Sequence, residues 1–170
     1  MHASCFATEG KPMNAWQLAQ QLVRIDSSNP GAQEDTIERY IKLLVEQHVS
    51  SMPACLVKHI SIKELEVFPA RRNLNVTVAG YGSAPNLVYI CHMDTVTLGE
   101  GWSTDTLALG ATVRENRLYG RGACDMKGGL ACALFRSVLA NGRHGAYRHS
   151  TRAWVLTHLY RGRGSQHARR

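Results

Sequence analysis

A histidine and an aspartate stand one residue apart at the end of an apolar run, and these two residue types can do chemistry. His92 and Asp94 directly follow residues 86–91 (NLVYIC), a run typical of a buried strand. Strand alternation places both side chains on the same side of the chain. Open α/β sheets bind ligands at the carboxyl ends of their strands, so the pair stands where a site is expected. The plainer interpretation is a polar strand end that faces water.

A second acid lies in a glycine-rich segment just before an apolar, helix-like run. Asp125 is surrounded by Gly120, Gly122, Gly128 and Gly129. Glycine lets a backbone turn tightly and approach a ligand closely. The alternative is an acid that only caps the following helix. A phosphate-binding loop is disfavoured, because the G-x-x-x-x-G-K-[ST] pattern is absent and an acid would repel phosphate.

The two segments together resemble the N-terminal motifs of a known enzyme family. Residues 91–96 (CHMDTV) and 120–129 (GRGACDMKGG) are similar to the paired motifs of the acetylornithine deacetylase / succinyl-diaminopimelate desuccinylase family, which also contains the aminoacylases and glutamate carboxypeptidases. The resemblance extends over residues 13–141. Three shorter segments contribute to it, namely residues 26–31 (DSSNPG), 72–76 (RNLNV) and 101–105 (GWSTD).

The resemblance implies a zinc hydrolase and gives each of the three residues a role. His92 would bind zinc. Asp94 would be a catalytic residue that accepts a hydrogen bond from the other imidazole nitrogen of His92 and fixes its tautomer. Asp125 would bridge two metal ions, zinc or alternatively cobalt, because a carboxylate offers one oxygen to each. The implied reaction is hydrolysis of an amide bond in an N-acyl amino acid or small peptide.

Other parts of the family's site have no counterpart in this sequence. The family also needs a glutamate base followed at once by a glutamate ligand, then a later acidic ligand and a distant histidine. No Asp or Glu follows Asp125, and the place of the glutamate pair falls near Tyr160 and Arg161. We therefore expect the N-terminal half of a catalytic domain, without the family's dimerising lid domain and inactive alone.

Hydrophobic periodicity predicts the elements that must position these residues. Helices are expected over residues 14–25, 33–48 and 126–140. Strands are expected over residues 60–68, 74–79 and 86–91, the last as a buried central strand, with a hairpin over residues 107–119. Residues 150–160 fit either a strand or no regular structure. This order predicts an α/β fold, a layered catalytic domain like that of zinc peptidases, with a mixed sheet and flanking helices.

Charge divides the chain into two parts. The net charge of the 170 residues is +7, yet residues 1–140 are neutral, and residues 141–170 hold seven arginines and no acid. We expect a disordered leader over residues 1–12, a partial catalytic domain over 13–141 and an Arg-rich tail over 142–170. A reading-frame shift after about residue 141 would explain the tail, because the codons of residues 161–164 (RGRG) can encode glutamates in another frame.

The Arg-rich tail also supports a different function, the binding of nucleic acid or another acidic surface. That interpretation leaves both motifs unexplained.

No apolar run is long enough for a membrane helix. Five cysteines without C-x-x-C spacing favour a reducing, cytoplasmic setting over a disulfide framework. Of the residues beside the motifs, Cys91 is expected to be buried and Lys127 to be solvated.

Overall fold

The computed structural model describes residues 13–29, 33–69, 71–80, 85–139 and 153–158. The helices are α1 (Ala15–Arg24), α2 (Glu34–Ser50), α3 (Ala54–Val57) and α4 (Gly128–Leu134). The strands are β1 (Ser28–Asn29), β2 (Ile60–Phe68), β3 (Arg71–Val78), β4 (Leu87–His92), β5 (Thr95–Val96), β6 (Thr112–Arg114), β7 (Arg117–Tyr119) and β8 (Ala153–His158). A wide turn, Ala123–Lys127, precedes α4, and a π-helical turn, Phe135–Leu139, follows it.

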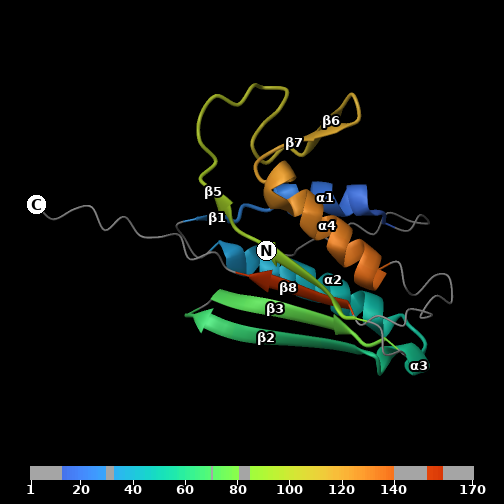
Figure 1. The fold of residues 1–170 in the computed structure, drawn as a ribbon. Coiled ribbons are helices and arrows are strands. Elements are labelled where there is room, and N and C mark those ends of the chain that lie inside the picture. Colours follow the sequence, from blue (N-terminus) through green and yellow to red (C-terminus); the bar gives the residue numbers. More distant parts are fainter. Residues whose placement is uncertain (1–12, 30–32, 70, 81–84, 140–152, 159–170) are drawn as a thin grey trace, which may run out of the picture.

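The main sheet is mixed and has the strand order β2-β3-β8-β4. Strands β2 and β3 are antiparallel, as are β3 and β8, whereas β8 and β4 run parallel. Helices α1, α2 and α4 lie together on one side of this sheet (Figure 1). The predicted α/β fold with a mixed sheet and flanking helices is therefore confirmed.

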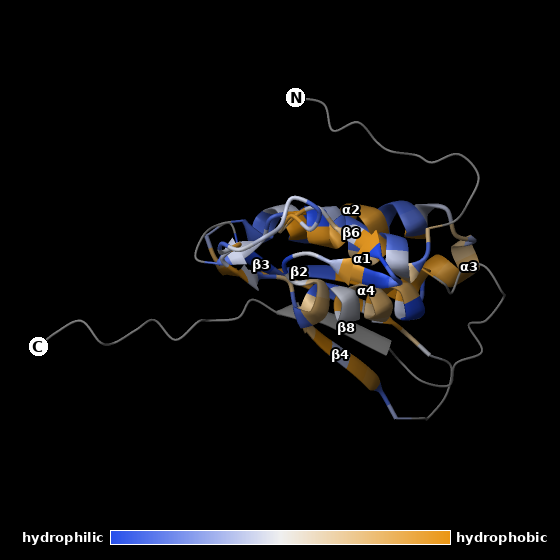
Figure 2. Cartoon of the chain, turned by 90° about the horizontal axis from the view of Figure 1, so that it is seen from above, coloured by the Kyte–Doolittle hydropathy of each residue, from blue (hydrophilic) through white to orange (hydrophobic). Residues whose placement is uncertain are grey.

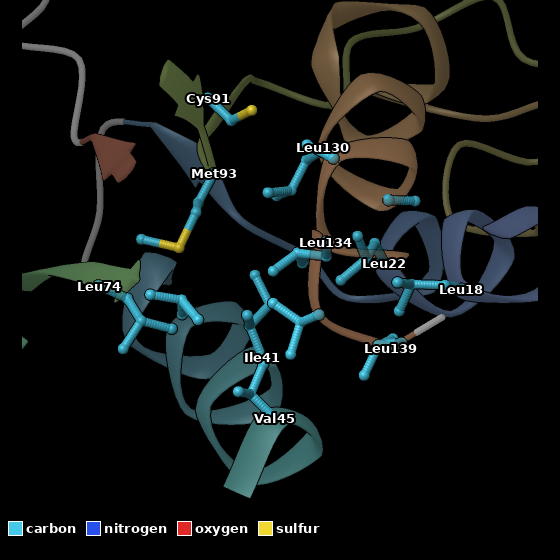
Figure 3. Close-up of a cluster of buried hydrophobic side chains, with 14 of the residues drawn as sticks. Leu18, Leu22, Ile41, Val45, Leu74, Cys91, Met93, Leu130, Leu134 and Leu139 are labelled. Atoms are coloured by element: carbon cyan, nitrogen blue, oxygen red, sulfur yellow. The ribbon is translucent and has the colours of Figure 1, made fainter. Parts of the chain in front are cut away.

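One hydrophobic core lies between the sheet and these helices (Figure 3). Strand β3 alternates, so Leu74, Val76 and Val78 are buried while the residues between them are half-buried. The start of α1 is fixed by a capping box, in which the Asn14 side chain accepts from the backbone of Gln17 and the Gln17 side chain accepts from that of Asn14. Fully buried leucines of α1 and α4, Leu18, Leu22, Leu130 and Leu134, join the two helices.

Most expected elements occur, with shifted ends. Strand β3 begins at Arg71 instead of residue 74, because its polar first residues pair with the end of β2. Helix α4 begins at Gly128, since Asp125 and Met126 have non-helical backbone angles. The hairpin is shorter than predicted and turns at Glu115 and Asn116, both with positive φ.

The prediction that residues 86–91 form a buried central strand is wrong in the described sheet. Strand β4 lies at its edge, because β8 occupies the position between β3 and β4. Its apolar character is plain in Figure 2, yet Leu87, Val88 and Ile90 are exposed, and only Cys91 is buried as expected. The described residues cover the face of β4 that carries Cys91 and leave the face with Val88 and Ile90 exposed. An apolar run alone does not show whether both faces of a strand are covered.

The sheet also extends past the predicted domain end at residue 141, because β8 pairs with both β3 and β4. Residues 150–160, left open between two alternatives, thus contain a strand over Ala153–His158. Residues 1–12, 140–152 and 159–170 lie outside the described part, so the leader and the rest of the tail remain predictions. Among the described helices, none combines the length and apolar character needed to cross a membrane.

Candidate metal centre

His92 and Asp125 face each other at the carboxyl end of β4. The imidazole Nε2 of His92 lies 2.8 Å from Oδ1 of Asp125. His92 is the last residue of β4, and Asp125 comes from the wide turn before α4. The predicted convergence of these two residues is confirmed, and their role as metal ligands remains a prediction.

Asp94 meets the same imidazole on its other side, mainly through its backbone. His92 Nδ1 lies 2.9 Å from the Asp94 carbonyl oxygen and 3.4 Å from Asp94 Oδ1. The Asp94 side chain is buried, and its Oδ2 accepts a hydrogen bond from Asn29 Nδ2 at 3.3 Å. The expected contact to the carboxylate is thus the longer of the two, and the backbone carbonyl is the nearer acceptor for the Nδ1 proton.

These contacts leave two electron-pair donors pointing at each other. With the Nδ1 proton donated to the Asp94 carbonyl, a neutral His92 presents its Nε2 lone pair to the Asp125 carboxylate. A proton or a metal cation between the two atoms removes this repulsion. Burial lowers the pKa of His92, but the hydrogen bonds to Asp125 and to the Asp94 carbonyl, with both carboxylate charges, outweigh it and raise the pKa above 6.5. The pair therefore fits a cation.

Glycine is required where the Asp125 loop meets its neighbours. Gly122 has φ +78°, and a Cβ there would lie 2.6 Å from Thr95 Cγ2. A Cβ at Gly120, which has φ +153°, would lie 2.3 Å from Val23 Cγ1. The loop thus packs against β5 and α1 more closely than any other residue allows, as its glycine content predicts.

A hollow of about 510 Å³ opens beside the pair, and Arg121 and Cys124 line it with the three predicted residues. The guanidinium of Arg121 stacks over the Trp102 ring at 5.3 Å, and its Nη2 donates to the Leu98 carbonyl at 2.7 Å. The Trp102 ring thus supports one wall of this hollow through Arg121.

Two residues with a part in this region were missed from the sequence. Lys127, expected to be solvated, has only 1% of its surface exposed and donates from Nζ to the Ile25 carbonyl at 2.7 Å. Burial lowers its pKa to about 8, although the charge of Asp26 opposes this. Ser27 is fully buried and donates from Oγ to the Met93 carbonyl at 2.8 Å. One indication of their importance was present in the sequence, which is that both residues lie within segments that carry the family resemblance.

Within the described residues, no three or more His, Cys, Asp or Glu side chains lie close enough together to hold a metal ion. The described part of the chain therefore brings together two candidate ligands, His92 and Asp125, with Asp94 behind the histidine.

Known proteins with similar sequences belong to one family of peptidases and deacylases. Residues 88–144 match Peptidase family M20/M25/M40. The succinyl-diaminopimelate desuccinylase of Methylobacterium radiotolerans is 34% identical over 152 residues, covering 86% of this chain and 34% of that protein. The acetylornithine deacetylase of Edwardsiella ictaluri is 36% identical over 105 residues, covering 60% of this chain and 24% of that protein.

The fold is found among solved structures as well. A M20 family metallo-carboxypeptidase from Sulfolobus solfataricus superposes with a TM-score of 0.63 and 17% identity, covering 85% of this chain and 30% of that one. This chain spans about a quarter to a third of the length of these two curated relatives. By motifs, sequence and fold, the chain resembles the N-terminal part of the M20/M25/M40 peptidase family.

Proposed function

We propose that this chain carries part of the active site of a metal-dependent hydrolase that cleaves an amide bond in N-acyl amino acids or small peptides. The observation that supports this most directly is the facing of His92 Nε2 and Asp125 Oδ1 at 2.8 Å. The names of the matched relatives, a desuccinylase and a deacetylase, point to an acyl group on nitrogen as the substrate feature. Neither name supports the nucleic-acid alternative.

Zinc is the metal we propose, with cobalt as a substitute. Imidazole nitrogen and carboxylate oxygen are both ordinary zinc ligands. His92 would offer Nε2, and Asp125 would offer one carboxylate oxygen to each of two ions. The exposed fraction of the Asp125 side chain, 86%, leaves its second oxygen accessible. When bound, zinc acts as a Lewis acid toward the scissile carbonyl.

The protein's own residues would orient the ligands and receive the substrate. The Asp94 carbonyl holds the Nδ1 proton of His92, so that Nε2 keeps its lone pair for the metal. Asn29 in turn holds the Asp94 carboxylate. The hollow lined by Arg121 and Cys124 would receive the substrate.

For the 170-residue chain we propose weak zinc binding and negligible turnover. Tight zinc sites usually have four ligands, and the described residues bring only two together. A general base is worth about 10²–10⁴-fold in rate, and no Asp or Glu follows Asp125 to serve as one. We also propose a reducing, cytoplasmic setting from the cysteine spacing.

Zinc titration of the purified chain tests this function. Wild type should bind zinc in the micromolar range or more weakly, and His92→Ala and Asp125→Asn should each lower the affinity at least about tenfold. His59→Ala, a histidine outside the hollow, is the matched control and should bind as wild type does. Unchanged affinity in both site variants would refute the metal centre. Submicromolar binding would refute the proposed weak zinc site, and turnover of N-acetyl amino acids would refute the proposal that the chain is inactive alone.

A further inference from the structure

We propose that Ser27 and Lys127 are positioning residues that hold the two loops of the metal centre to a common support, the turn formed by residues 25–29. This inference rests on the proposed metal centre and adds to it the part of the fold that sets the distance between His92 and Asp125. Neither residue is among those that line the hollow.

The first loop is fixed to this turn by side chains and backbone together. Ser27 Oγ donates to the Met93 carbonyl at 2.8 Å, and the Thr95 amide donates to the Ser27 carbonyl at 2.9 Å. Strands β1 and β5 pair there in parallel, with Ser28 opposite Thr95. Asn29 reaches the Asp94 carboxylate. The segment from Met93 to Thr95, directly after His92, is therefore held to the turn along its whole length.

The second loop is fixed to the same turn by Lys127. Its buried Nζ donates to the Ile25 carbonyl at 2.7 Å, across 102 residues of sequence. Its amide donates to the Gly122 carbonyl at 2.8 Å, and a Cβ on Gly122 would lie 3.2 Å from Lys127 Cδ. The lysine stem thus lies against the loop that carries Asp125, and its ammonium reaches the turn.

The burial of the Lys127 ammonium is not explained by packing alone. Burying a charge costs free energy that methionine or leucine would not cost. The ammonium of Lys127 donates a hydrogen bond to the Ile25 carbonyl and is attracted to the charge of nearby Asp26. An apolar side chain would make neither interaction. We infer that this contact keeps the Asp125 loop in register with the His92 loop.

The test uses the 170-residue chain with Co²⁺ and Zn²⁺ as probes. Lys127→Met keeps the length of the side chain and removes the ammonium, and Ser27→Ala removes one hydroxyl. Each should weaken metal affinity about tenfold and alter the visible absorption of bound Co²⁺. Val45→Ala, in the core face of α2, is the control for lost stability, and Lys58→Met is the control for loss of an exposed lysine. Both controls should keep the affinity and the spectrum of wild type.

Measurements on the metal-free chain separate this inference from the proposed function. The ¹⁵N shifts of the His92 ring report its contact with Asp125, and they should change in Lys127→Met and Ser27→Ala but not in Val45→Ala. If His92→Ala leaves metal affinity unchanged, the metal centre is wrong, and the ring shifts alone decide on positioning. Wild-type ring shifts in both variants, or an equal change in Val45→Ala, would overturn the inference. Should Lys127→Met not fold, Ser27→Ala decides by the same criteria.

Discussion

The Nε2 atom of His92 and the Oδ1 atom of Asp125 lie 2.8 Å apart, although 33 positions separate the two residues in sequence. The contact joins the end of a strand to the turn before a helix. The segment that follows His92 and the turn that carries Asp125 each hydrogen-bond to residues 25–29. Three chain segments therefore position the pair: the end of β4, the turn before α4 and residues 25–29. The protonation of His92 depends on how these segments are arranged.

Asp125→Asn should lower the pKa of His92. The Asp125 carboxylate raises this pKa by a hydrogen bond and by its charge, and asparagine keeps the size without the charge. Because the pKa of folded His92 lies above its ordinary 6.5, the pair stabilises the fold below pH 6.5, and this is lost as pH rises through the raised value. The variant should therefore lose more stability at pH 5.5 than at pH 8. Proton NMR titration of the ring measures the pKa, and Asp105→Asn is the control. A rise in the pKa of His92 would contradict the prediction.

Glu38→Gln should stabilise the protein in alkaline more than in acidic buffer. Glu38 is fully buried on α2, and burial together with the Glu64 charge raises its pKa from 4.5 to about 7. Between these values the folded chain binds more protons at this site than the unfolded chain, so stability falls as pH rises through that window. Glutamine removes the buried charge. Thermal unfolding at pH 5.5 and pH 8 should show the larger gain at pH 8. An equal gain at both values would show that Glu38 is not protonated in the fold, and Glu46→Gln serves as the comparison on the same helix.

Arg71→Ala should destabilise the fold by about 3 kcal/mol, because loss of one partner leaves the other charge buried. The partner is Glu34, whose side chain has only 1% of its surface exposed and which pairs with the Arg71 guanidinium. The double variant Glu34→Gln with Arg71→Met should cost less than Arg71→Ala alone. Urea denaturation gives both free energies of unfolding. A double variant that is less stable than Arg71→Ala would show that the unpaired Glu34 carboxylate is not the cause of the loss.

Part of the fold and of the candidate site could be predicted from the sequence. The fold class and the meeting of His92 with Asp125 were predictable, because hydrophobic periodicity and two motifs carry that information locally. The edge position of β4 was not, since an apolar run such as residues 86–91 records burial without saying which strand lies beside it. The burial of Lys127 was not predictable either, because a single lysine has no periodicity, and its environment is set by the turn at residues 25–29, about 100 positions away.

Ile90→Thr with Val88→Thr should reduce self-association of the chain without loss of stability. Both side chains lie on one face of β4, and Ile90 is 68% exposed. The strand also forms an edge of the described sheet, which favours pairing with another chain. Threonine keeps the β-branched shape and adds a hydroxyl. Sedimentation equilibrium should show a lower mean mass for this variant than for Leu43→Thr, which changes an exposed leucine on α2. Wild-type chain that sediments as a monomer would contradict the prediction.

Gly122→Ala should separate the two loops of the proposed metal centre, and Gly101→Ala provides a matched control. Both glycines have positive φ, +78° and +83°, so either substitution meets the same backbone strain of roughly 1–2 kcal/mol. They differ in space: the added methyl at residue 101 has no atom within 4 Å, whereas at residue 122 it would lie 2.6 Å from Thr95 Cγ2. Overpacking of that kind costs roughly 1–3 kcal/mol more. Because Thr95 adjoins Asp94 and Gly122 precedes Asp125 by three positions, relief of the clash should move the loops apart. Gly122→Ala should therefore lower both stability and zinc affinity, and Gly101→Ala should lower stability alone. Equal zinc affinities in the two variants would show that the separation of the loops does not control the site.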